Sequence, residues 1–239
     1  MRALALLLIA LVFAAPAKSE EHVEERAQGR VMLGAHEQHD WRGVGRLNFG
    51  DGFCTGALVL PDVVVTAAHC LIVKRTGAKR LPERTHFVAG YRLRRHQGHR
   101  IASGFSIHPE YLIADPGALA ATASDLALVK LREPLDKIEP FPLTHGLGAG
   151  DEVTILSYGR DRPEIPSIQS PCGVIARVQA IAVLDCDITY GVSGSPVFRM
   201  VDGEWRIVAV VTSMGQFMGE QRSFAVVLDS AIGGVLAIP

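Results

Sequence analysis

Short apolar runs, separated by turn residues, make up most of the chain beyond residue 40. The clearest pair consists of Ala57–Leu60 and Val63–Thr66, which flank Pro61-Asp62 and predict a β-hairpin. The run Asp125–Leu131 predicts a largely buried strand, and "HFVAGY", "EVTILSYG", "GVIARVQAI", "SPVFRM", "WRIVAVVTSM" and "SFAVVL" read as further strands. Helical periodicity is confined to short stretches near residues 67–72 and at the C-terminus. This pattern predicts an all-β sandwich or barrel.

The middle of the chain divides the apolar runs into two groups. Residues 133–148 contain Pro134, Pro140 and Pro142, and proline cannot donate a hydrogen bond to a central strand. We therefore expect a connector at 133–148, between a first β unit at 41–132 and a second β unit with the C-terminal segment at 149–239. The alternative is a long surface loop within a single sandwich.

The N-terminus has the pattern of an export signal. Arg2 precedes a short apolar run from Leu4 to Ala15, and Ala15-Pro16-Ala17 provides small residues for cleavage. The run is short for a membrane span, so residues 1–17 predict a cleaved signal peptide and no membrane attachment after its removal. Residues 18–40 begin with a highly charged stretch, which is typical of a flexible segment or a propeptide. We expect a secreted or periplasmic protein.

Composition narrows the classes of partner. The 239 residues carry a formal net charge of −1 and only 6% aromatic residues. The chain therefore has neither the overall positive charge nor the aromatic content that would favour binding of nucleic acid. Four cysteines in an exported chain favour two disulfides, with three pairings open. No C-x-x-C pair is present, and His36 and His39 have no further ligand cluster, so we expect no metal site and no cofactor.

Three short segments together provide the groups of a nucleophilic hydrolase. They are "TAAHC" around His69, "SDLAL" around Asp125 and "GVSGSP" around Ser193. A serine hydroxyl is a weak nucleophile that needs a positioned base, and imidazole titrates near the working pH. A carboxylate on the second imidazole nitrogen orients the ring. Taken singly, each segment is as well explained by a turn, a cap or a structural histidine.

"TAAHC", "SDLALVKL" and "GVSGSPV" resemble the signature blocks of the trypsin-like (chymotrypsin-fold) serine endopeptidases, in that family's order His, Asp, Ser. The resemblance extends from about Val31 to the C-terminus. It implies two antiparallel six-stranded β-barrels with the active site in the cleft between them. The 124-residue separation of His69 and Ser193 and the G-x-S-G-S-P motif resemble the compact bacterial members, near the glutamyl-endopeptidase-like branch.

The resemblance also implies roles for individual residues. Ser193 would be the nucleophile, His69 the general base and Asp125 the orienting carboxylate, and the backbone N–H groups of Gly191 and Ser193 would form the oxyanion hole. A disulfide would join Cys54 to Cys70 and leave Cys172 and Cys186 as the second pair. The substrate would be a polypeptide; a protein inhibitor is a further expected partner, and we expect a monomer.

The substrate pocket and the activation route depart from the best-known members. The resemblance places Asp187, Thr189, Ser213 and Gly215 at the pocket, with Asp187 favouring Arg or Lys, although a turn role for Asp187 and a glutamate preference remain alternatives. "RVMLG" after residue 29 resembles an activation site, but Val192 stands where many animal members carry an aspartate. The usual salt bridge to a new N-terminus cannot form, so we expect a different maturation.

Two other functions compete with an active endopeptidase. A non-catalytic relative would keep the fold and bind a partner, which the intact set of three residues disfavours. A serine esterase of another fold would need the order Ser, Asp, His and long helices between strands, and the sequence has neither.

Overall fold

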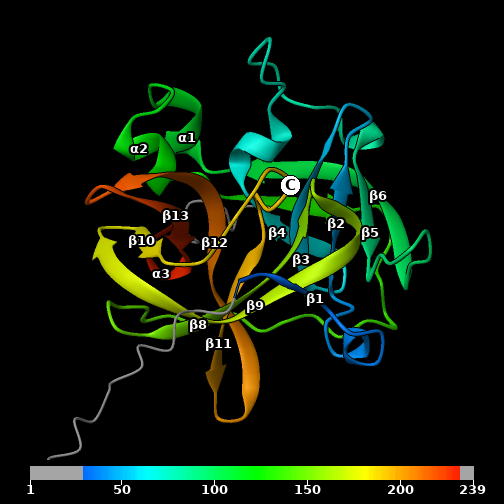
Figure 1. Ribbon diagram of the computed structural model, residues 1–239. Coiled ribbons are helices and arrows are strands. Elements are labelled where there is room, and N and C mark those ends of the chain that lie inside the picture. Colours follow the sequence, from blue (N-terminus) through cyan, green and yellow to red (C-terminus); the bar gives the residue numbers. More distant parts are fainter. Residues whose placement is uncertain (1–28, 232–239) are drawn as a thin grey trace, which may run out of the picture.

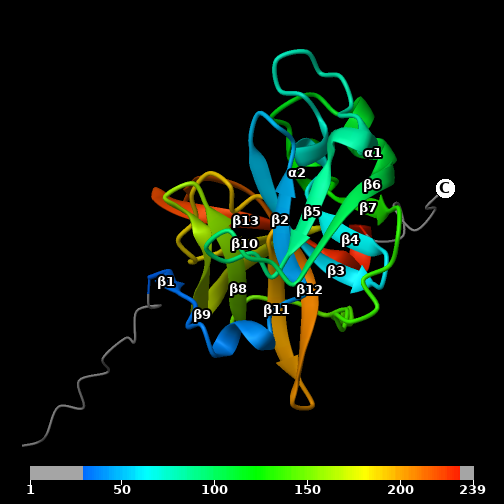
Figure 2. The same ribbon diagram turned by 90° about the vertical axis from the view of Figure 1, so that its right-hand side faces the viewer.

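Two closed antiparallel barrels, packed side by side, form the part of the chain that the computed structural model describes, residues 29–231 (Figures 1 and 2). The expected signal peptide at 1–17 and the charged residues up to 28 lie outside the described residues. No described helix has the length and apolar character needed to cross a membrane.

The first barrel has the strand order β2-β3-β4-β7-β6-β5. The predicted hairpin is confirmed, because Ala57 and Leu58 pair with Val65 and Val64. All four residues of β4 are buried, which suits its β-branched composition. The strands are β2 (Val44–Asn48), β3 (Phe53–Leu60), β4 (Val63–Thr66), β5 (His86–Ala89), β6 (Gly98–Ile107) and β7 (Ala127–Leu131).

The second barrel closes through the order β9-β10-β13-β12-β11-β8, because β8 also pairs with β9. A seventh strand, β1, lies on the outside of β9, with Val31 opposite Ile168. The strands are β1 (Val31–Met32), β8 (Glu152–Gly159), β9 (Arg162–Val178), β10 (Ile181–Leu184), β11 (Pro196–Val201), β12 (Glu204–Phe217) and β13 (Glu220–Val227). The fold class expected from the sequence, two six-stranded antiparallel barrels, is therefore confirmed.

Helices are short, and all but α3 lie between strands. The expected helix near residues 67–72 is a 3-10 turn, and α3 lies at the end of the described residues, in the region where a C-terminal helix was expected. In addition, α1 and α2 lie together in the segment before β7 (Figure 1). The helices are η1 (Glu37–His39), η2 (Ala68–Leu71), η3 (Pro82–Arg84), α1 (Pro109–Ile113), α2 (Leu119–Ala123) and α3 (Leu228–Ala231).

One of the three apolar clusters joins the barrels. It combines Val44 and Val65 of the first barrel with Tyr158 and Phe198 of the second. Trp41, which precedes β2, packs on Phe198 with ring centroids 5.0 Å apart. The barrels are therefore fixed against each other by a shared core. A site built from residues of both barrels is held in place by this core.

The segment 18–40 is only partly described. From residue 29 onward the chain follows the domain: β1 pairs with β9, and Leu33 is 1% exposed. Its N–H donates to the carbonyl oxygen of Pro166 at 2.9 Å. The residues after 30 thus belong to the folded domain rather than to a detached leader.

Candidate active site

The three segments singled out in the sequence meet where the barrels join. His69 lies in η2, directly after β4, and Asp125 lies just before β7, which pairs with β4. Ser193 lies in the loop that precedes β11 of the second barrel. The β4–β7 pairing explains why residues 56 positions apart come together.

Asp125 holds His69 by two hydrogen bonds. The backbone N–H of His69 donates to Oδ1 at 2.8 Å, and Nδ1 of the ring lies 2.7 Å from Oδ2. The Asp125 side chain is 8% exposed, whereas 36% of the His69 side chain is accessible. A carboxylate at Nδ1 places the proton there and leaves Nε2 free to accept one.

The protonation of His69 reflects two opposing effects. Burial of the ring lowers its pKa, but the charge of Asp125 and its hydrogen bond raise it, and the charge of Lys74 lowers it. The attraction of Asp125 prevails, so that the pKa of His69 lies above the ordinary value of 6.5. The imidazole can therefore take up a proton readily near neutral pH.

The loop around Ser193 depends on two glycines in left-handed conformations. Gly191 has φ +93° and Gly194 has φ +81°, values that favour glycine. Gly194 donates to the carbonyl oxygen of Val211 at 2.7 Å, which attaches the loop to β12. Within the described residues, the N–H groups of Gly191 and Ser193 donate to no protein acceptor. Both donors are therefore available to a ligand beside Ser193.

Thr55 in β3 connects the first barrel to the Ser193 loop and to β8 of the second barrel. No feature of the sequence pointed to this residue. Its N–H donates to the carbonyl oxygen of Ser193 at 2.9 Å, and its hydroxyl donates to that of Gly191 at 3.1 Å. The same hydroxyl accepts from the N–H of Tyr158 at 3.0 Å. Thr55 is fully buried. No local pattern marks this residue, since these three partners lie more than 100 positions away.

The structure brings Ser193 to the segment that carries His69. A Cβ built on Gly194 would lie 3.1 Å from the backbone nitrogen of Ala67, two residues before His69. No hydrogen bond joins Ser193 Oγ to His69 Nε2 among the described side chains. Catalytic hydrogen bonds of this kind often tighten only when substrate binds.

Val192 belongs to the core of the second barrel. It is fully buried with Val197, Val211 and Ile188 near it in the same apolar cluster. An apolar residue here cannot pair with a protonated N-terminus, in agreement with the departure noted in the sequence.

The candidate pocket residues do not form a buried acidic pocket. The Asp187 side chain is 67% exposed, and its Oδ2 lies 3.7 Å from Nε of Arg30, whose own side chain is only 7% exposed. Arg30 also donates to Asp161 at 3.0 Å. The side chain predicted to select Arg or Lys thus already lies beside an arginine of the same chain.

The other residues predicted for the pocket lie in the segment before β11 and in β12. Thr189 accepts from the N–H of Val192 at 3.2 Å, and Ser213 and Gly215 lie in the half of β12 that leads away from Val211. Ser213 is exposed, and its one side-chain hydrogen bond among the described residues is to Thr212 at 3.5 Å. Among the described residues, Ser213 therefore makes no hydrogen bond to Asp125.

Both expected disulfides are present. Cys54–Cys70 joins β3 to η2 and closes 16 residues, and Cys172–Cys186 joins β9 to the start of the segment that leads to Ser193. Two groupings of metal-ligand side chains occur in the described chain, and both consist of these bonded cysteines with His69 or Asp185. Their sulfur atoms are bonded to each other and are not free as thiolate ligands.

The comparisons with known proteins agree with this architecture. The family described as "Trypsin-like peptidase domain" matches residues 54–210, which is more than half of the chain. A solved structure titled "Structure of Glu endopeptidase in complex with MPD" superposes with a TM-score of 0.72 at 18% sequence identity. The superposition covers 87% of this chain and 93% of that one. At this identity the match supports the fold.

Proposed function

Because the chain belongs to the trypsin-like peptidases, and is a serine endopeptidase that hydrolyses peptide bonds, we propose that Ser193, His69 and Asp125 form its catalytic triad. The observation that carries this assignment is the two-point attachment of His69 to Asp125, through the backbone N–H and through Nδ1. A histidine with a purely structural role would not need a buried carboxylate on its ring and its backbone at once.

The proposed reaction proceeds by acyl transfer. Ser193 Oγ attacks the substrate carbonyl carbon while its proton passes to His69 Nε2, and the carbonyl oxygen becomes an oxyanion beside the N–H groups of Gly191 and Ser193. His69 then gives the proton to the departing amine, and the C–N bond breaks. Water, activated by the same imidazole, hydrolyses the acyl-enzyme and regenerates the Ser193 hydroxyl.

We propose export and action on polypeptides outside the cytoplasm. Residues 1–17 would be removed as a signal peptide, after which the protein would work as a secreted or periplasmic monomer that a protein inhibitor could block. Two disulfides support an oxidising compartment.

For the primary pocket we propose a preference for Arg or Lys, with Asp187 as the recognising carboxylate and Thr189, Ser213 and Gly215 as neighbours. In this arrangement the substrate cation competes with Arg30 for Asp187. A preference for glutamate is the alternative, because the solved structure of similar fold is named a Glu endopeptidase.

The triad is tested by intact mass before and after reaction with a fluorophosphonate. The wild-type protein is expected to gain one adduct and Ser193→Ala none. Ser195→Ala is the matched control, because the Ser195 hydroxyl is buried and donates to the Val192 carbonyl oxygen. Absence of the adduct on oxidised, processed wild-type protein would instead favour a non-catalytic binding protein.

The pocket is tested with peptides that differ only before the cleaved bond. We expect higher kcat/KM for Arg and Lys than for Glu or Ala, and Arg30→Gln to raise the ratio for Arg over Ala because it frees Asp187. Faster cleavage after Glu would refute the pocket assignment and leave the triad intact.

A further inference from the structure

A basic hairpin follows His69 directly. Residues 72–80 form a turn in which Ile72 pairs with Lys79, and the N–H of Val73 donates to the carbonyl oxygen of Ala78 at 2.8 Å. Gly77, at φ +70°, permits the reversal. The hairpin projects as the cyan loop at the top of Figure 1. It is an ordered projection rather than a strand of the barrel.

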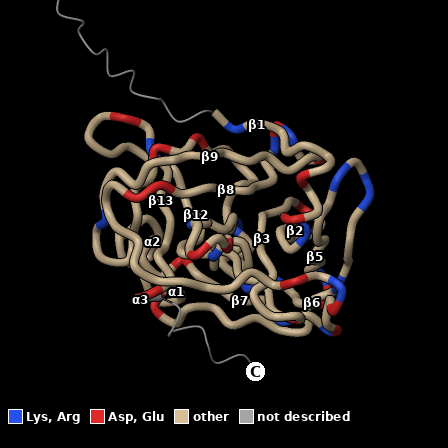
Figure 3. Tube along the Cα trace, turned by 90° about the horizontal axis from the view of Figure 1, so that it is seen from below, with Lys and Arg blue, Asp and Glu red and all other residues tan. Residues whose placement is uncertain are grey.

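Three of the four cations on this projection have no ionic partner among the described residues. Lys74, Arg75 and Lys79 are exposed, and none makes an ion pair with another described residue. Basic and acidic residues both occur over much of the described chain (Figure 3), and residues 92–100 form a second basic stretch with four arginines and no acidic residue. In the whole stretch 72–84, Glu83 is the single acidic residue against five basic ones. The stretch is therefore strongly positive in a chain whose net charge is −1.

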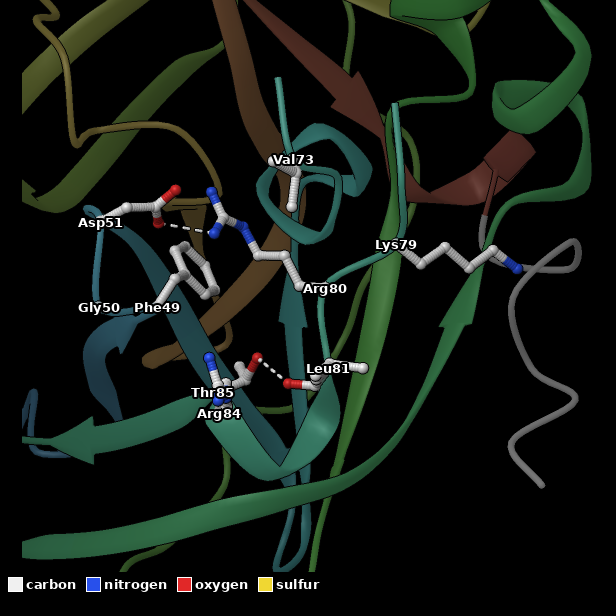
Figure 4. A pocket seen from close by; sticks show the side chains of 9 residues that line it. All are labelled: Phe49, Gly50, Asp51, Val73, Lys79, Arg80, Leu81, Arg84 and Thr85. Atoms are coloured by element: carbon white, nitrogen blue, oxygen red, sulfur yellow. Dashed lines mark hydrogen bonds and ion pairs between the residues drawn. The ribbon is translucent and has the colours of Figure 1, made fainter. Parts of the chain in front are cut away.

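A cavity of about 410 Å³ extends this positive surface beside the hairpin. Phe49, Arg80 and Arg84 are among its lining residues (Figure 4). The Arg80 guanidinium lies 4.4 Å from the centre of the Phe49 ring and 2.7 Å from Oδ1 of Asp51. Arg80 is thus held in place by neighbours, whereas Lys79 extends away from it in Figure 4.

The hairpin is fastened to the segment of His69. Arg80 donates through Nε to the Cys70 carbonyl oxygen at 2.9 Å and through its N–H to that of Leu71 at 2.8 Å. The Ile72 N–H donates to the His69 carbonyl oxygen at 3.2 Å. The charge of Lys74 also lowers the pKa of His69, after the larger effects of burial and Asp125, and so lies within electrostatic range of the ring. The base of the hairpin therefore adjoins the segment of the proposed general base.

The position relative to Ser193 indicates which half of a substrate would lie there. The Ser193 loop is bounded by β3, through the N–H of Thr55, and by β12, through the carbonyl oxygen of Val211. The proposed pocket for the residue before the cleaved bond lies on the β12 side, at Ser213 and Gly215. The Cys54–Cys70 disulfide places the hairpin on the opposite, β3 side. That side would receive the residues after the cleaved bond.

We propose that Lys74, Arg75, Lys79, Arg80 and Arg84, which we call the basic hairpin surface, bind acidic side chains of the substrate on the leaving-group side. The inference rests on the proposed endopeptidase function and adds a substrate class to it. Aspartate and glutamate carboxylates are the complementary groups in a polypeptide, and exposed arginine and lysine attract them at a distance.

Exposed ion pairs are individually weak, so several must act together. Three acidic residues against this surface should raise kcat/KM by about five- to thirtyfold at low ionic strength. Because the Debye length shortens from about 10 Å at 0.1 M salt to about 3 Å at 1 M, the gain should shrink steeply as NaCl is added.

The test compares two quenched fluorescent peptides with the same residue before the cleaved bond. One carries Glu-Asp-Glu and the other Gln-Asn-Gln at the second to fourth positions after it. The ratio of their kcat/KM values is measured for wild type, for Lys74→Gln/Arg75→Gln/Lys79→Gln, and for a charge-matched control. The control removes three exposed cations elsewhere, two between β5 and β6 and one in the connector after β7, by Arg94→Gln, Arg95→Gln and Lys137→Gln.

The expected result is a ratio well above one for wild type and control, and a ratio near one for the hairpin variant. Equal ratios in all three proteins, or a ratio of one for wild type at low salt, would overturn the proposal. An equal fall of the ratio in the control would also overturn it, since net charge alone would then explain the preference. Fluorophosphonate labelling separates these outcomes from failure of the proposed function, because that probe does not require the hairpin.

Discussion

Gly194→Ala should be far more costly than the same substitution at Gly203, although both glycines have φ +81°. The two positions share the backbone strain and differ in their surroundings. A Cβ on Gly194 would lie well under 3.0 Å from Thr66 Oγ1 and from the Thr55 carbonyl oxygen, whereas one on Gly203 meets nothing within 4 Å. The pair therefore isolates the cost of inserting a methyl group between the Ser193 loop and the first barrel.

The magnitude follows from two contributions. A left-handed alanine costs about 1–2 kcal/mol, which applies to both variants. Overpacking against β3 and β4 adds about 1–3 kcal/mol at Gly194 alone, because one of the obstructing atoms is backbone. We expect a loss of unfolding free energy of about 1–2 kcal/mol for Gly203→Ala and about 2–5 kcal/mol for Gly194→Ala.

The assay is urea denaturation of both variants and wild type, with the fluorophosphonate labelling rate measured in parallel. Gly194→Ala should label slowly, because the shifted loop displaces Ser193, while Gly203→Ala should label at the wild-type rate. Equal destabilisation of the two variants would refute the argument that the Ser193 loop is pressed against the first barrel.

Three further outcomes follow from the site. The acidic limb of the kcat/KM profile should have its midpoint above pH 6.5, because the base acts only when neutral and Asp125 raises the pKa of His69. Asp125→Asn should lower kcat by about 10⁴-fold and move that midpoint down, since burial and the charge of Lys74, which both lower the pKa, remain. Replacing Cys54 and Cys70 by serine should reduce the unfolding free energy by about 3 kcal/mol in a denaturation assay, whereas unchanged stability would contradict a structural role for this bond. Thr55→Val should cost about 1–3 kcal/mol, because the buried N–H of Tyr158 loses its acceptor, and a thermal melt at wild-type temperature would contradict that.

The sequence predicted those strands whose apolar runs are continuous. The hairpin of β3 and β4 and the buried strand β7 follow from runs of Val, Leu and Ala bounded by Pro61-Asp62 or a polar residue. The strand β9 was expected only from residue 173, because Pro163, Pro166 and Pro171 interrupt its first part. Those prolines are accommodated in a long strand whose register with β8 shifts twice.

For the candidate site too, the sequence predicted some features and not others. The sequence singled out His69, Asp125 and Ser193 because their three segments occur together in one chain, and their catalytic roles stay predictions. The surroundings of Asp187 were not foreseeable, because its partner Arg30 lies 157 positions earlier and reaches it only through the pairing of β1 with β9. The short helices α1 and α2 were missed since five residues carry too little periodic pattern to be recognised.

Three hydrogen bonds that Thr55 makes to the second barrel limit how this enzyme can be recombined with its relatives. Exchanging one whole barrel between two such proteins leaves most of the core inside each barrel intact. Residue 55 then comes from one parent, and its partners Gly191, Ser193 and Tyr158 come from the other. Only serine and threonine offer a short hydroxyl that can donate to one backbone group and accept from another. Chimeras should therefore stay active when the incoming first barrel carries one of these two residues at position 55, and screens of shuffled libraries should recover that constraint.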